Sequence, residues 1–74
     1  MRTVAICSDT DACMGLRLVG VESHHATSEE ELTLVLGKLE IADIGIIVVC
    51  ESFLPSPAFE FFQKKNPQIL FAGF

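Results

Sequence analysis

The sequence predicts an α/β fold, a three-layer sandwich in which a four-stranded parallel sheet carries helices on both faces. Short β-branched apolar segments alternate with segments whose apolar residues recur at helical spacing, which is the pattern of successive β-α units. Residues 43–50 are almost continuously apolar, as expected of a central parallel strand buried on both faces. Half of the 74 residues are hydrophobic, and this composition suits a sheet that is covered on both sides.

Seven elements are expected along the chain, in the order β-α-β-α-β-α-β. The predicted strands cover residues 3–7, 21–26, 43–50 and 68–72. The predicted helices cover residues 11–19, a segment that follows Ser28 and continues to Leu39, and residues 57–65. Short connections and right-handed crossovers favour the strand order 2-1-3-4. Residues 1–74 are thus expected to form a single globular domain.

The first helix follows a polar turn at the carboxyl end of the first strand. Asp9 or Thr10 is the expected N-cap. Apolar residues at i, i+4 and i+7 predict the face that packs on the sheet, namely Ala12, Leu16 and Val19. Gly15 lies beside this face, so the helix is expected to sit close to the sheet.

The second and third helices carry clear start signals. Ser28 and Glu31 form a capping box, in which the serine accepts from an early helix N–H and the glutamate reaches back. The apolar face behind it consists of Leu32, Val35, Leu36 and Leu39. Ser56 and Pro57 predict the next start, with serine as the N-cap and proline at the first helical position.

Charge and cysteine usage narrow the function classes. The net charge of −5 and the pI near 4.7 argue against a nucleic acid or an anionic membrane as a partner. No apolar run approaches the ~20 residues of a membrane span. The odd number of cysteines, Cys7, Cys13 and Cys50, without a C-x-x-C pair indicates buried free thiols in a reducing compartment. A cytoplasmic protein is expected.

The acidic residues at the carboxyl edge of the predicted sheet leave two interpretations open. Asp9, Asp11 and Glu51 are expected to gather there, either as helix caps and solubilising acids or as a Mg²⁺ site of the kind found in receiver domains. Cys50 closes the third strand in place of a phosphorylatable aspartate, which favours the first interpretation.

Other catalytic and cofactor signals are weak in this sequence. His24 and His25 are neighbours on a predicted strand and point to opposite faces, so they do not readily share a metal. The sequence has neither a G-x-G-x-x-G loop nor a P-loop. It also has no Trp or Tyr to stack on a flavin, which weighs against a flavodoxin-type enzyme. We therefore expect no catalytic residues, no cofactor and no metal.

The phenylalanines indicate a contact surface. Phe59 and Phe62, at i and i+3, are the natural pair to pack on the sheet, and this leaves Phe61 pointing sideways or outward. Phe71 and Phe74 add apolar character at the carboxyl terminus. An exposed aromatic patch on a small acidic domain favours a protein interface, although the same residues also suit a core that packs every Phe.

The chain resembles the family of F subunits of V-type (A/V-type) ATP synthases and ATPases. The resemblance rests on the acidic turn at residues 8–11, the M-G-L-R-L-V-G-V segment at residues 14–21 and the acidic helix start at residues 28–31. It continues in the D-I-G-I-I-V-V strand at residues 43–49 and the P-Q-I-L segment at residues 67–70. These segments occur in the family's order and spacing over essentially the whole chain.

The resemblance implies a flavodoxin-like (Rossmann-like) domain that serves as a noncatalytic rotor part. In the family this protein belongs to the central stalk, binds the axle (D) subunit below the catalytic head, and helps to couple ATP turnover to proton or sodium transport. It lies in the cytoplasm, peripheral to the membrane. The family's tail helix after the fourth strand is absent from residues 1–74, and the third helix is Phe-rich where the family's is polar.

The residues expected to contact the axle, with the head subunits as further contacts, come from three segments. Arg17, beside the apolar face of the first helix, is expected to reach an acidic group of the partner. Phe61, Phe71 and Phe74 are the expected apolar contacts. The alternative to this interpretation is a degenerate receiver-like signalling domain whose acidic pocket consists of Asp9, Asp11 and Glu51.

Overall fold

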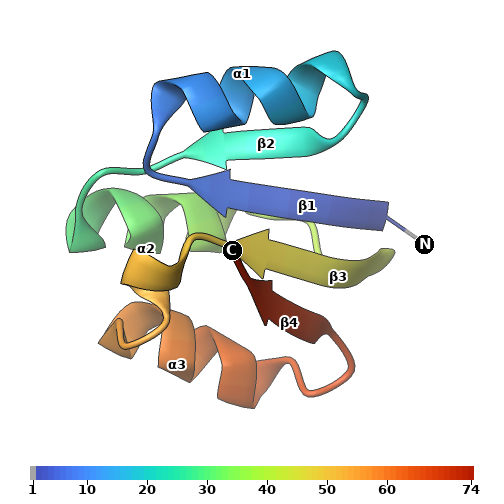
Figure 1. Ribbon diagram of the computed structural model, residues 1–74. Coiled ribbons are helices and arrows are strands. Elements are labelled where there is room, and N and C mark those ends of the chain that lie inside the picture. The colour runs from blue at the N-terminus through green and yellow to red at the C-terminus, as the bar shows by residue number, and fades with distance from the viewer. Residues whose placement is uncertain (1) are drawn as a thin grey trace.

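The computed structural model describes residues 2–74 and has a four-stranded, all-parallel sheet in the order β2-β1-β3-β4 (Figure 1). The strands are β1 (Arg2–Cys7), β2 (Glu22–His25), β3 (Ile44–Val49) and β4 (Leu70–Gly73). The helices are α1 (Thr10–Leu18), α2 (Glu29–Lys38) and α3 (Pro57–Lys65), with a short 3₁₀ helix η1 (Glu51–Phe53) after β3. The predicted fold class and strand order are confirmed.

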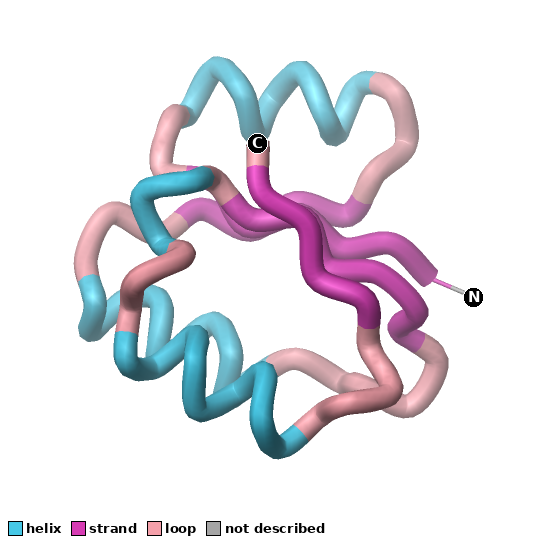
Figure 2. Tube along the Cα trace, turned by 60° about the horizontal axis from the view of Figure 1, so that its bottom comes forward, coloured by secondary structure: helices cyan, strands magenta, loops and turns pink. Residues whose placement is uncertain are grey.

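The helices divide unevenly between the two faces of the sheet. Figure 2 shows α1 alone on one side of the strands and α2 and α3 together on the other. The main hydrophobic core lies on the side of α2 and α3, where residues of the two central strands, β1 and β3, point. Its members are Val4, Ile6, Ala26, Leu32, Leu36, Ile44, Ile47, Val49, Phe53, Phe59 and Ile69.

The helix starts follow their predicted caps. Asp9, Ser28 and Ser56 are the N-caps of the three helices, and each side chain accepts a backbone N–H of the first turn. Glu31 reaches back as expected, but its carboxylate accepts the N–H and the hydroxyl of Thr27, one residue before the cap. The capping residues therefore set where these helices begin.

The predicted buried face of α1 is partly wrong. Cys13 is the buried residue of this helix, whereas Val19 is 75% exposed. The reason is that α1 ends at Leu18 and Val19 is its C-cap, outside the helical face. Gly20, at φ +88°, then turns the chain in the left-handed region that glycine tolerates. Gly15 does not bring α1 close to the sheet, since a Cβ there would meet nothing within 4 Å.

The prediction that all three cysteines are free thiols is wrong. Cys7, at the end of β1, and Cys13, in α1, form a disulfide, and Cys50 is the free cysteine. The turn between strand and helix brings the two Cα atoms to 5.9 Å, a separation typical of disulfides. The bond fastens the start of α1 to the carboxyl end of β1.

Candidate partner interface

An apolar groove of about 720 Å³ runs between α2 and α3 on the face away from the sheet. Both helices follow right-handed crossovers onto the same side of the sheet (Figure 2), so they pack next to each other and run in the same direction. The groove is lined by Thr33, Leu36, Gly37, Leu39, Ile41, Pro57, Ala58, Phe61, Phe62, Lys65 and Asn66.

Glu29 fixes the amino-terminal ends of the two helices to each other. Its carboxylate accepts the hydroxyl of Ser56, with oxygen–oxygen distances of 2.7 and 2.6 Å, and the backbone N–H of Ala58 at 3.0 Å. The hydrogen bond from Ser56, followed by the one from Ala58, holds the pKa of Glu29 below its ordinary value. Glu29 of α2 thus adds to the cap that Ser56 provides for α3, and these hydrogen bonds set the width of the groove at this end.

Phe61 stands at the rim of the groove. The prediction for the three neighbouring rings is confirmed, since Phe59 is fully buried, Phe62 is half-buried and Phe61 is 65% exposed. The ammonium group of Lys65 lies 5.2 Å from the centre of the Phe61 ring, within the range of a cation–π contact. The rim therefore presents an aromatic ring and a positive charge side by side.

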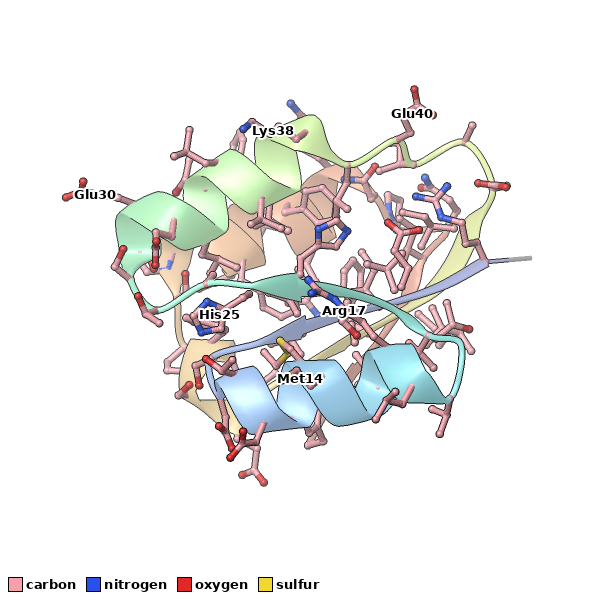
Figure 3. The ribbon with its side chains drawn as sticks, turned by 90° about the horizontal axis from the view of Figure 1, so that it is seen from above. Met14, Arg17, His25, Glu30, Lys38 and Glu40 are labelled. Atoms are coloured by element: carbon pink, nitrogen blue, oxygen red, sulfur yellow. A yellow bond between two sulfur atoms is a disulfide. The ribbon has the colours of Figure 1, made fainter. Side chains whose placement is uncertain are left out.

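Arg17 lies on the opposite side of the sheet from the groove. Figure 3 shows it between α1 and β2, and its guanidinium donates to the backbone carbonyl of Ser23 at 3.0 Å. This contact helps to hold α1 on the edge strand. The structure therefore does not bring Arg17 together with Phe61 in one surface.

Phe71 and Phe74 also lie in different surroundings. Phe71, in β4, makes edge-to-face contacts with Phe59 and Phe62, at centroid distances of 5.4 and 6.1 Å, and is half-buried beneath α3. Phe74 follows β4 and is 45% exposed. Its backbone bonds to Val49 and Glu51 extend the sheet edge. Phe74 is the more accessible of the two residues.

The residues considered for metal binding do not form a site. Within residues 2–74 no three His, Cys, Asp or Glu side chains are grouped so that they could hold a metal ion. Asp9 caps α1 instead. His24 pairs with Glu22 at 2.9 Å, whereas the ring of His25 lies 3.1 Å from the Ser8 carbonyl oxygen, so the two histidines do point to different places.

Cys50 is the one free thiol in the part of the chain that the structure describes. Burial raises its pKa, but hydrogen bonds with the hydroxyls of Ser52 and Ser8, at 2.9 and 3.3 Å, outweigh burial, and its pKa lies below the ordinary value. No histidine forms a hydrogen bond with this sulfur among the described residues, so the nucleophile–base pair of a cysteine enzyme is not assembled here.

Sequence reasoning found the exposed Phe61 but missed the groove beside it. The available signal was an apolar flank at the end of α2, made by Leu36 and continued past the helix by Leu39 and Ile41, together with a second apolar flank on α3 at Phe61. That these flanks face each other follows from the bond between Glu29 and Ser56, which joins residues 27 apart in the chain.

Comparison with known proteins adds the decisive observation. A family model described as the ATP synthase (F/14-kDa) subunit matches residues 4–70, which is nearly the whole chain. No protein in the curated set of sequences matches this chain. No helix within residues 2–74 has the length and apolar character needed to cross a membrane.

Proposed function

Because the chain belongs to the family of ATP synthase (F/14-kDa) subunits, we propose that it is the noncatalytic F component of the central stalk of a V-type ATP synthase or ATPase. In this role residues 1–74 act as a single globular domain that binds the axle (D) subunit. The domain helps to couple ATP turnover in the head to proton or sodium transport in the membrane. It lies in the cytoplasm, peripheral to the membrane, as part of the complex.

The observation that carries this proposal is the family match over residues 4–70. The shape of the domain supports it, since a largely apolar groove and an exposed aromatic ring suit contact with another protein. The negative net charge is consistent with a protein partner rather than a nucleic acid. The receiver-like alternative is not retained, because the described residues do not gather an acidic metal site.

The proposed contact residues differ in how readily they reach a partner. Phe61 and Phe74 are exposed and need no rearrangement. Arg17 already donates to Ser23, and its remaining N–H groups are the ones left for an acidic partner group. Phe71 is held between two other rings, so it supports the surface from below.

Calorimetric titration of this chain into the axle protein of the same organism tests the proposal. We expect one-to-one binding of micromolar affinity or tighter. The matched control is an isolated protein of the catalytic head, for which weaker binding is expected. An absence of heat and of co-elution with the axle protein at micromolar concentrations would contradict the proposed role.

A further inference from the structure

We propose that the α2–α3 groove is the binding site for one helix of the axle. This helix presents an apolar stripe and one carboxylate that lies opposite Lys65. The inference rests on the proposed function and adds to it the surface and the chemistry of the contact. It is carried by the shape of the groove, by its charge and by the hydrogen bonds of Glu29 that join the two helices at one end.

The shape of the groove matches a helix. Two parallel helices with a groove between them can accept the row of side chains of a third helix, as ridges pack into grooves in ordinary helix packing. The floor and walls are supplied mainly by aliphatic and aromatic carbon. Leu36 is buried, Leu39 and Phe62 are partly buried, and Phe61 is exposed at the rim. An apolar helical stripe of i, i+3, i+4 and i+7 residues is the standard occupant of such a surface.

The charge of the groove is the reverse of the charge of the domain. The chain has ten acidic and five basic residues, yet the single charged residue among those that line the groove is Lys65. Its ammonium group has no carboxylate within salt-bridge distance in the described residues and lies over the Phe61 ring instead. A carboxylate on the incoming helix would therefore meet an unpaired cation at the edge of an apolar contact, where an ion pair helps to orient the partner.

The groove is preformed. Glu29 ties the start of α2 to the start of α3, whereas Lys65 lies at the other end, in the last turn of α3. Glu29 therefore lies at one end of the helix pair and Lys65 at the other. Figure 3 shows Glu30 and Lys38 at opposite ends of α2, both directed outward. The partner's carboxylate is therefore expected at the Lys65 end of the groove.

Two pairs of variants test the inference with the axle protein as the probe. Phe61→Ala removes the exposed aromatic ring and Lys65→Glu sets a negative charge against the partner's carboxylate, and each is expected to weaken the binding of the axle by about tenfold or more. Leu18→Ala and Lys38→Glu are the matched controls. The first removes an apolar side chain that is 85% exposed on α1, and the second reverses a lysine in the last turn of α2 outside the groove lining. Both controls are expected to bind within about twofold of wild type.

The partner's carboxylate can then be identified by charge reversal. Acidic residues on the surface of the axle protein are changed one at a time to lysine, and one of these variants is expected to restore tight binding to Lys65→Glu while weakening the binding of wild type. Circular dichroism confirms that each variant of this chain is folded, as expected for exposed positions.

The outcomes separate the two proposals. If wild type fails to bind the axle protein, the proposed function is wrong and the groove assignment fails with it. If wild type binds and the groove variants bind equally well, the role stands and the groove assignment is wrong. If wild type alone forms a dimer in sedimentation that Phe61→Ala dissociates, the groove holds a second copy of this chain, which also overturns the inference.

Discussion

The two faces of the sheet are held by different kinds of interaction. On the α2 and α3 side, large side chains such as Leu32 and Phe59 are fully buried in a continuous hydrophobic core. On the α1 side, Cys13 is the buried residue of the helix, and α1 is attached by the Cys7–Cys13 disulfide and by the bond from Arg17 to β2. One face therefore depends on buried apolar volume and the other on a few directed bonds.

This difference shows how a chain of 74 residues supports a sheet covered on both faces. A domain of this size buries only about 60% of the surface of its unfolded chain, so it has apolar area for one substantial core. That core lies on the side where two helices meet. The other side is left with a thinner contact, in which a covalent bond and a hydrogen bond replace burial.

The largest expected effect is at the centre of the core. Replacing Phe59 with alanine removes a fully buried ring and leaves a cavity, at a cost of about 3–5 kcal/mol, which approaches the whole stability of a small domain. Urea titration followed by circular dichroism is expected to show a largely unfolded variant. The control Phe61→Ala, at a 65% exposed position, should stay within about 0.5 kcal/mol of wild type. Equal stabilities of the two variants would contradict the core assignment.

The next effect is on the α1 side. The disulfide joins residues six apart, and closing so short a loop is worth about 2 kcal/mol in the chain-entropy description. Wild type is therefore expected to lose about this much stability when dithiothreitol is added. The double variant Cys7→Ala/Cys13→Ala should be insensitive to the reductant. If reduction leaves the wild-type urea midpoint unchanged, α1 is held by its noncovalent contacts alone.

A gain of stability is expected at Gly15. Glycine in a helix interior costs about 0.5–1 kcal/mol relative to alanine, and a Cβ at this position has open space around it. Gly15→Ala should therefore raise the thermal midpoint. The matched variant is Gly37→Ala in α2, which also has open space but lines the groove, so it should gain stability while weakening partner binding. A loss of stability in Gly15→Ala would show that α1 packs more closely than described.

The smallest effect is the dependence of stability on pH at the α2–α3 clamp, the set of hydrogen bonds from Ser56 and Ala58 to Glu29. The pKa of Glu29 is lower in the folded protein than in the unfolded chain, chiefly because of the hydrogen bond from Ser56. Its contribution is therefore fully present above the unfolded pKa, near 4.5, and is lost as the pH falls through the folded value.

Thermal midpoints between pH 7 and pH 3 measure this dependence. Glu29→Gln should weaken the loss of stability at acidic pH, and the effect is small because the carboxylate is exposed to solvent. Glu30→Gln, whose side chain makes no hydrogen bond among the described residues, should follow wild type. An unchanged acid transition in Glu29→Gln would show that the clamp does not depend on the charge.

The features that the sequence predicted are those fixed by local chemistry. Ser28 and Ser56 set helix starts, and the i and i+3 spacing of Phe59 and Phe62 identified the rings that face the sheet. The β-branched run around β3 identified a central strand, and the predicted strand order is also correct. Short connections and the handedness of crossovers leave few other arrangements.

The features that were not predicted depend on how separate elements are placed relative to one another. The pairing of Cys7 with Cys13 depends on the angle at which the turn delivers α1, and six residues of spacing do not specify that angle. Val19 has the right spacing for the buried face, but the helix ends one residue earlier. The groove depends on Glu29 reaching Ser56 in the next helix, which no periodicity within either helix records.

The strand order also determines when this sheet can form as the chain leaves the ribosome. β1 is synthesised first and lies between β2 and β3, so its second partner appears only when Ile44 and its neighbours emerge, about 40 residues later. At 5–20 residues per second this delay is ~2–8 s, during which one edge of β1 has no neighbour. Nascent β1 is therefore the segment for which a bound chaperone, or a pause in translation after α2, would matter most.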